Sequence, residues 1–374
     1  MAASPSNLCH HDYTIGLISA LPLEMAAVTA MLDERHPDLP TKPNDDNAYV
    51  LGRINAQHVV LASATIANQI RLTFPSIRIG LMVRIGGGVP ETREDIRLGD
   101  IVVSKPSRDH GGIVQYDYGK SLADGVFSRQ GVLNKPPPIF LTAISRLQAT
   151  HFTRASQIPC LTSELASTSC LAYPGADFDI LFDFEYDHKS PLAICKDCAP
   201  GRRVKRSLRV SQDPVIHYGL IASANQVIKD GRMRDKLAEE LGFLCFEVEA
   251  AGLMDSFPCL VFRRICDYSD SHKSKEWQGY AAATAAAYAK ELLSVIHAKQ
   301  VEDEPLKLFA RDPELLDRSS SYRHQRVHRR LAHKRLAGTT QWFLKSPEFK
   351  EWSERRFNKL WCSGKSKLNP RKDW

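Results

Sequence analysis

Short apolar runs rich in β-branched residues alternate with longer helix-like stretches, and this alternation constrains the fold more than any other feature of the sequence. The strand-like runs are Tyr13–Ala20, Tyr49–Ile54, His58–Ser63, Ile77–Ile85, Ile101–Ser104, Ile216–Ala222, Phe243–Glu247 and Cys259–Ile265. The helix-like stretches are Leu23–Asp33, Phe140–Ala149, Arg232–Leu241, Glu249–Met254 and Ala281–Ile296. Strands interleaved with helices predict an α/β sheet that is covered on both faces.

The same pattern divides the chain into regions. Residues 12–299 carry the alternation and form the expected main domain, but it fades between about 150 and 210, where we expect an insertion of loops and short helices. Residues 300–338 are charged and Ser-containing, as in a linker. Residues 339–374 have helical character, so we expect a helical C-terminal tail.

Charge is distributed unevenly. Residues 301–374 hold 18 Lys and Arg against 10 Asp and Glu, whereas the first 300 residues hold 32 against 33. Basic residues in the tail alternate with Glu and Trp, which favours a solvated helical face over a nucleic-acid interface. No apolar stretch approaches the roughly 18 residues that cross a bilayer, and the N-terminus lacks the pattern of a secretory signal. We therefore expect a cytoplasmic protein without membrane or nucleic-acid partners.

Nine cysteines are scattered along the chain, and Cys195 and Cys198 form a single Cys-x-x-Cys pair. A structural zinc site takes four ligands, so the pair supplies half of one. Under one interpretation His188 and Cys170 complete the site. Under the other, which the irregular spacing favours, the pair is two reduced thiols in a surface insertion. The expectation is that no metal binds.

Polar groups follow three of the predicted strands, at the edge where open α/β sheets build their sites. Glu24 follows the first strand, Arg84 precedes a run of three glycines, and acidic residues at 247, 249 and 267 end two further strands. Cleavage of an N-glycosidic bond needs such groups. A carboxylate stabilises the oxocarbenium-like sugar, an acid protonates the leaving base, and a carboxylate or an anion-binding loop serves the nucleophile, water or phosphate.

Six motifs occur in a characteristic order. They are YTIGLISALPLEM at 13–25, IGGGVP at 85–90, LGDIVVS at 98–104, GLIASAN at 219–225, FEVEAAG at 246–252 and RICDYSD at 264–270. Together they resemble the domain of purine nucleoside phosphorylases, uridine phosphorylases and methylthioadenosine/adenosylhomocysteine nucleosidases that many fungal proteins contain. The resemblance implies a three-layer αβα fold with a mixed central sheet. It also implies a nucleoside ligand, no cofactor, inorganic phosphate as a candidate co-substrate, and a homo-oligomer.

The resemblance also assigns roles to residues. Asp267 matches the acid that serves purine N7, and Glu249 matches the carboxylate that binds the ribose hydroxyls. Glu24 matches the carboxylate with which nucleosidases activate water. The residues expected around sugar and base are Glu247, Val248 and Asn225.

The nucleophile side departs from the family pattern. Relatives usually carry a Gly-rich loop after the strand at 58–63, and about a dozen of its residues are missing here. Arg84 stands where relatives usually have glycine, immediately before the expected anion-binding glycines Gly86 and Gly87. Two interpretations remain: Arg84 fills the anion pocket, or it binds phosphate as a similarly placed arginine does in hexameric phosphorylases.

The tail resembles the lead-in to a NACHT-type nucleotide-binding domain of fungal NOD-like receptors. The match lies in TTQWFLKSPEF at 339–349 and LWCSGK at 360–365, and we expect it to stop before an NTPase. Two functions are therefore expected. The first is a nucleoside phosphorylase or nucleosidase that acts on a purine-type nucleoside. The alternative is a catalytically impaired nucleoside-binding sensor or effector module of a NOD-like receptor-type protein.

Overall fold

The computed structural model describes residues 8–306, except 41, 43–44, 46, 64–69, 91–93, 108, 189–194 and 196–197. The chain divides into a unit Met1–Lys307 and a unit Leu308–Trp374, and everything below concerns the first. The helical tail at 339–374 and all but the first residues of the expected linker lie outside the described residues. So do residues 64–69, the centre of the shortened loop.

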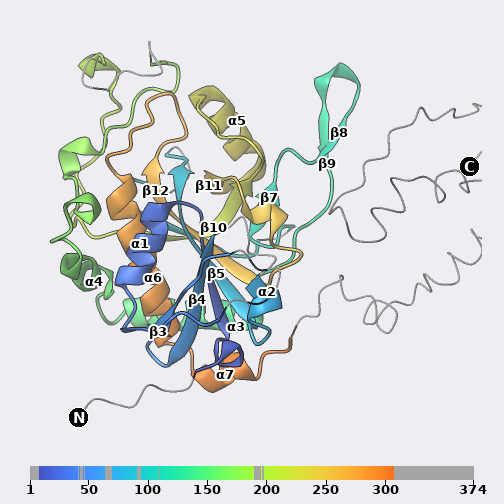
Figure 1. The fold of residues 1–374 in the computed structure, drawn as a ribbon. Coiled ribbons are helices and arrows are strands. Elements are labelled where there is room, and N and C mark those ends of the chain that lie inside the picture. The colour runs from blue at the N-terminus through green and yellow to red at the C-terminus, as the bar shows by residue number, and fades with distance from the viewer. Residues whose placement is uncertain are drawn as a thin grey trace, which may run out of the picture. The chain divides into compact units, whose positions relative to one another are not determined.

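A mixed sheet forms the middle of the unit (Figure 1). Its strand order is β11-β10-β6-β12-β5-β1-β4-β3-β2, with β7 paired to β10, while β8 and β9 form a separate hairpin. The strands are β1 Ile15–Ser19, β2 Glu34–Arg35, β3 Val50–Ile54, β4 Gln57–Ser63, β5 Ile79–Gly88, β6 Ile101–Ser104, β7 Ile113–Gln115, β8 Gly119–Ser121, β9 Phe127–Arg129, β10 Ile216–Ser223, β11 Phe243–Glu247 and β12 Cys259–Asp267.

Strand β5 is the hub of the sheet. It pairs in parallel with β1 and β12, and its last residues also pair antiparallel with β11. Because β11 is connected through β10 and β6 back to β12, these five strands close into a ring. In the register, Gly87 lies opposite Asp267 on one side and Phe246 on the other. The ring therefore brings the ends of β5, β11 and β12 to one place.

One face of the sheet is covered by helices that share a single large core. The helices of the unit are α1 Pro22–Ala30, α2 Ile70–Thr73, α3 Pro138–His151, α4 Ile158–Glu164, α5 Gly231–Leu241, α6 Gln278–Ser294 and α7 Ala298–Glu302. Residues of α1, α3, α4 and α6 are buried together with Ile15, Leu17 and Leu81 of the sheet. The many alanines of α6 are small enough for this helix to lie against both α1 and the sheet.

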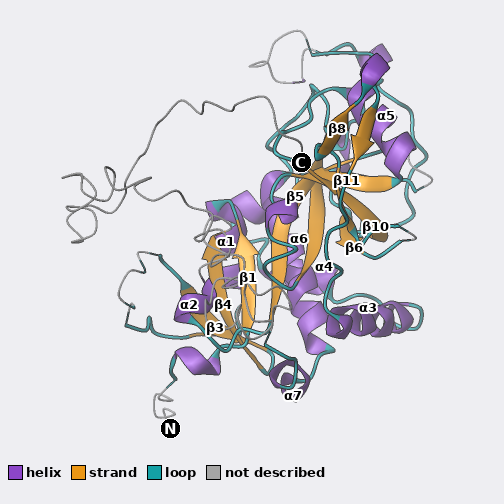
Figure 2. Cartoon of the chain, turned by 90° about the vertical axis from the view of Figure 1, so that its right-hand side faces the viewer, coloured by secondary structure: helices purple, strands orange, loops and turns teal. Residues whose placement is uncertain are grey.

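The opposite face is covered by other segments. Side chains alternate along a strand, so Gly16 and Gly80 face away from the side that Ile15 and Leu17 occupy. Phe257 packs there so closely that a Cβ on Gly80 would lie 1.9 Å from its ring. Helix α5 belongs to a second core with residues of β10 and β11 (Figure 2). The expected αβα arrangement is thereby confirmed. No helix among the described residues has the length and apolar character needed to cross a membrane.

Two local expectations differ from the structure. The glycines were expected to follow a strand that ends at Ile85, but β5 continues through Gly88 because both neighbouring strands pair with it there. The expected helix at 249–254 is only a single 3-10 turn, Ala250–Gly252. In the described part of the stretch 150–210, the structure has α4, three short 3-10 helices (Ser169–Leu171, Ala176–Phe178 and Pro200–Arg202) and loops. That this stretch is an insertion stays a prediction.

Candidate active site

A pocket opens where the strand ends meet. It is lined by Leu21, Glu24, Arg84, Ile85, Gly86, Gly87, Gln226, Val227, Ile228, Phe246, Glu247, Val248, Glu249, Cys266, Asp267, Ser269, Lys273 and Gln278. Its volume of about 200 Å³ is matched by two other pockets, so size does not single it out. Its lining residues do single it out, because every site residue expected from the sequence except Asn225 lines this pocket.

Glu247 and Arg263 form a buried ion pair beneath the pocket. Arg263 Nη2 donates to the Glu247 carboxylate, and both side chains are almost fully enclosed. The carboxylate also accepts the backbone N–H groups of Glu249 and Ala250 at 2.9–3.1 Å. Burial raises the pKa of Glu247, but Arg263 and these donors lower it more, so the net pKa is below the ordinary value. Glu247 thus shapes the turn that presents Glu249.

Arg84 bridges two of the expected functional carboxylates. Its Nη2 donates to Glu249 Oε1 at 2.6 Å, and its Nε lies 3.6 Å from Glu24 Oε2. The side chain is only 5% exposed, and its Nη1 atom has no hydrogen-bond partner among the described residues. Burial raises the pKa of Glu249 above its ordinary value, although Arg263 and Arg84 oppose the shift. The arginine therefore lies between Glu24 and Glu249.

Glu24 is held from two elements. Oε2 accepts the backbone N–H groups of Ala20 and Leu21 at 2.7 and 2.9 Å, which caps the start of α1. Oε1 accepts the N–H of Ile85 in β5 at 2.9 Å. The carboxylate is nearly inaccessible at 2% exposure. Glu24 therefore caps α1 and lines the pocket at the same time, and its backbone donors fix the orientation of the carboxylate.

Asp267 ends β12 beside three donors, one of which is the Cys266 thiol, whose Sγ lies 3.2 Å from Asp267 Oδ2. Ser269 N–H donates to Oδ1 at 3.0 Å, and the Lys273 ammonium lies 3.0 Å from Oδ2. Ser269 has a φ of 53°, an uncommon conformation for a residue other than glycine, and the turn around the carboxylate imposes it. A Cβ on Gly87 would lie 2.1 Å from Ser269 Oγ and 2.8 Å from Asp267 Oδ1. Glycine at 87 therefore makes room for the acid.

The apolar wall of the pocket comes from β11 and from the loop after β10. Phe246 contributes from β11 and Val248 from the residue just after it, and Val227 and Ile228 contribute from the loop. Asn225 does not line the pocket. It is exposed, and its backbone N–H donates to Asp117 Oδ2 at 3.0 Å just after β10 ends. The neighbouring Gln226 takes the place that was expected for Asn225.

Sequence reasoning missed two cations, Arg263 and Lys273. The sequence does point to a role for Arg263, because an arginine inside an otherwise apolar strand requires an internal partner. The carboxylate that partners it depends on how β11 and β12 are placed in the ring, which the sequence does not show. Lys273 lies in a loop six residues beyond Asp267, and no local pattern distinguishes it from an exposed lysine.

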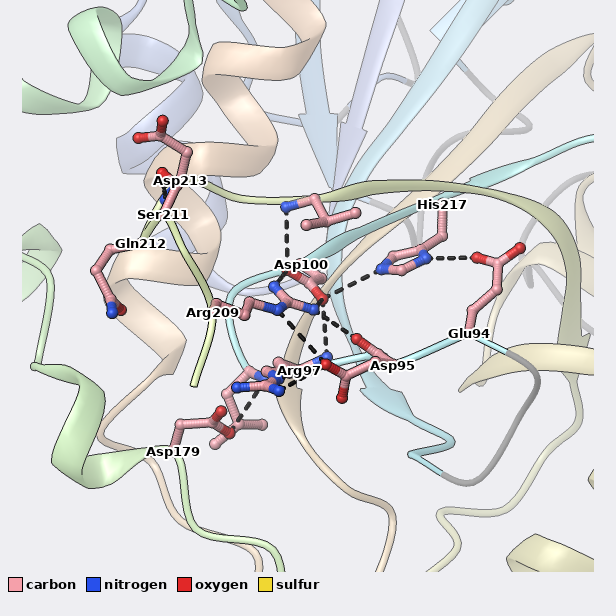
Figure 3. Close-up of polar contacts among 12 residues, drawn as sticks. Glu94, Asp95, Arg97, Asp100, Asp179, Arg209, Ser211, Gln212, Asp213 and His217 are labelled. Atoms are coloured by element: carbon pink, nitrogen blue, oxygen red, sulfur yellow. Dashed lines mark hydrogen bonds and ion pairs between the residues drawn. The ribbon is translucent and has the colours of Figure 1, made fainter. Parts of the chain in front are cut away.

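The motif at 98–104 serves a second charged cluster, outside the pocket (Figure 3). Asp100 is 1% exposed and accepts both Nη atoms of Arg209 at 2.6 Å. His217 Nε2 lies 3.1 Å from it, and the N–H groups of Arg97 and Val215 complete its shell. Every donor comes from the protein itself, so this cluster joins the loop before β6 to the start of β10.

Comparisons with known proteins support the fold. No family model matches the chain. A nucleotide-binding leucine-rich repeat (NLR)-like protein of Hyaloscypha variabilis is 43% identical over 318 residues, which cover 81% of this chain and 31% of that protein. The 5'-methylthioadenosine/S-adenosylhomocysteine nucleosidase of Mycobacterium tuberculosis is 24% identical over 295 residues, covering 76% of this chain and 96% of the enzyme.

A solved structure shows the same fold. A putative 5'-methylthioadenosine/S-adenosylhomocysteine nucleosidase from Borrelia burgdorferi, bound to adenine, aligns with a TM-score of 0.50 and 14% identity over 76% of this chain and all of that one. The chain has the fold of a nucleoside phosphorylase or nucleosidase-type domain. It spans about a third of the length of its NLR-like relative. Within this nucleosidase-type domain, the pocket at the ends of β5, β11 and β12 is the candidate active site.

Proposed function

We propose that the pocket binds a purine-type nucleoside and hydrolyses its N-glycosidic bond. The observation that carries the proposal is the convergence of Glu24, Glu249 and Asp267 on one pocket from three separate parts of the chain. Phe246, Val248 and Ile228 supply an apolar wall against which a flat base packs. The Glu249 carboxylate is 29% exposed, and under this proposal it accepts hydrogen bonds from the ribose hydroxyls.

The chemistry follows from these positions. The bond between the sugar C1′ and the base nitrogen breaks, and its electron pair leaves with the base. Asp267 delivers a proton to N7, so the base departs neutral, while the Lys273 ammonium 3.0 Å from Asp267 stabilises the carboxylate that remains. Water forms the new bond to C1′, and its proton passes to Glu24. Proton return from Glu24 to Asp267 through solvent resets the site.

Charge favours water over phosphate as the nucleophile. At the Arg84 end of the pocket, Glu24, Glu247 and Glu249 outnumber the guanidinium groups of Arg84 and Arg263 by one. A phosphate dianion would enter a region that is already negative. The backbone of Gly87 is also paired on both sides within the sheet, so it does not form an open anion-binding loop.

The test is release of free base, measured by HPLC on inosine, adenosine and methylthioadenosine, with and without phosphate. We expect free ribose or its 5-methylthio form as the second product and no dependence on phosphate. Asp267→Asn should lower kcat about 10²–10⁴-fold, as expected when a general acid is removed. The control Asp38→Asn changes an exposed aspartate far along the sequence and should have no effect. Unchanged turnover in Asp267→Asn contradicts the mechanism.

A second function is favoured by Arg84. Its contacts with Glu24 and Glu249 occupy both groups that catalysis needs. A domain of this kind would bind a nucleoside without turning it over, as a sensor or effector module of an NLR-like protein. Calorimetry that shows nucleoside binding, combined with no base release by HPLC, would establish this second function and exclude the first. Absence of both binding and release would exclude the two together.

A further inference from the structure

A group of metal-ligating side chains lies outside the candidate active site. Among the described residues, the ligand atoms of His188, Cys195 and Cys198 all lie within 4.8 Å of one another. Cys198 is buried, and the other two residues are partly buried. Cys170, which was considered from the sequence as a ligand, is exposed and outside the group. Two thiols with Cys-x-x-Cys spacing and an imidazole are the donor set that zinc prefers.

We propose that these three residues bind a structural zinc ion, with His272 as the fourth ligand. In a tetrahedral site with sulfur at about 2.3 Å and nitrogen at about 2.0 Å from zinc, ligand atoms lie about 3.5–3.8 Å apart. The side chains of the group therefore need to move together by about 1 Å. Rotation of the cysteine side chains supplies a shift of this size.

His272 lies outside the group whose ligand atoms are all within 4.8 Å of one another, and its surroundings make it the candidate for the remaining position. Its ring centroid lies 5.4 Å from that of His188, and its carbonyl oxygen lies 3.5 Å from Cys195 Sγ. The side chain is 4% exposed, and Nε2 has no hydrogen-bond partner among the described residues. Nδ1 lies 4.0 Å from Asp270 Oδ1. A histidine with a carboxylate behind one nitrogen and the other nitrogen open is the usual arrangement of a zinc ligand.

The surroundings indicate what the ion does. His272 stacks on Phe182 of the insertion, with ring centroids 4.1 Å apart, and His188 N–H donates to Ser271 Oγ at 2.8 Å. The proposed site thus joins the insertion to the loop that follows β12. Asp267, the last residue of β12, precedes this loop, and Lys273 adjoins His272. Zinc would therefore fix the loop that follows Asp267, without contacting the pocket.

The experiment measures zinc in the full chain, purified under reducing conditions with zinc supplied and then desalted. Metal analysis should give about one equivalent per chain. Replacement by cobalt should give thiolate-to-cobalt charge-transfer absorption and the intense visible bands of tetrahedral coordination. Cys195→Ser, Cys198→Ser and His188→Ala should each lose most of the metal, whereas Cys160→Ser and Cys170→Ser should retain it, because both are exposed and outside the group.

A second measurement on the unaltered chain does not depend on whether the variants fold. With zinc bound, the thiols of Cys195 and Cys198 should resist a thiol reagent until a chelator is added, and the thermal midpoint should fall with the chelator. Reduced protein that holds no zinc and leaves both thiols reactive would overturn the proposal. His272→Ala that binds zinc as tightly as the unaltered chain would overturn the fourth ligand alone. None of these readouts requires nucleoside turnover.

Discussion

Two buried charge clusters in the same unit have different designs. Around Asp100, each carboxylate oxygen is occupied by donors from Arg209, His217 or the backbone. Around Arg84, the pairing is incomplete. Glu249 is 29% exposed to the pocket, and Arg84 Nη1 has no hydrogen-bond partner among the described residues. A saturated cluster fastens two segments together, whereas an unsaturated one retains capacity for a ligand.

Removing a charge should have different consequences in the two clusters. A buried charge that loses its partner destabilises the fold by several kcal/mol, because its desolvation is no longer compensated. A charge at the edge of a pocket remains partly hydrated, so its removal changes ligand binding more than stability. Matched substitutions in the two clusters should therefore affect different measurements.

The largest effect on stability is expected from Asp100→Asn. The change removes the charge that compensates Arg209 at a side chain with 1% exposure, and we expect the free energy of unfolding to fall by about 3–5 kcal/mol. Urea unfolding followed by circular dichroism measures it. Asp95→Asn is the control, because Asp95 contacts the same arginines but is 52% exposed, and it should cost less than about 1 kcal/mol. Equal losses in the two variants would remove the distinction between the clusters.

Glu249→Gln should affect ligand binding more than the free energy of unfolding. Loss of a charged hydrogen-bond acceptor is expected to weaken nucleoside binding about 10–100-fold. Stability should fall less than in Asp100→Asn, because the buried Arg84 keeps the Glu24 carboxylate 3.6 Å from its Nε. Calorimetry and urea unfolding give the two numbers. In the unaltered chain, binding should weaken as pH falls through the raised pKa of Glu249, and the variant should lack this dependence. The exposed Glu239→Gln serves as the control. Full affinity in Glu249→Gln would show that Glu249 does not hold the ribose.

The smallest effect is a pH dependence of stability from His217. Burial lowers the pKa of His217, but the carboxylates of Asp100 and Glu94 raise it more, so the folded pKa lies above the ordinary 6.5. The resulting stabilisation is complete below pH 6.5 and is lost as pH rises through the folded pKa. The free energy of unfolding should therefore decline over this interval. His217→Gln should flatten the curve, and an unchanged decline would assign it to another group.

Much of the fold was predictable because its signals are local. The apolar runs at 15–19, 216–223 and 259–267 are buried strands as expected, since each is continuous and bounded by turn residues. The closure of the ring was not predictable, because β5 and β11 pair across about 160 residues through only two residue pairs. The helix expected at 249–254 failed for a specific reason. The Glu247 carboxylate captures the N–H groups of Glu249 and Ala250, which favours a capped single turn.

In the candidate site, too, the features with local signals were predictable and those that depend on strand pairing were not. Residues at the ends of strands, such as Glu24, Glu249 and Asp267, were expected to meet and do line one pocket. Their roles in binding and cleavage remain predictions. Side-chain partners were not predictable where they depend on register, and so the bridge from Arg84 to Glu24 and Glu249 emerged only from the structure.

The ring of β5, β12, β6, β10 and β11 has a consequence for how the pocket changes. A strand with partners on both sides does not fray alone, so the Gly87 amide should exchange with solvent only through cooperative opening of the unit. The backbone beneath the pocket is then a fixed frame. Changes in what the pocket accepts must come from side chains that project from this frame, and Arg84 is the one that now spans it.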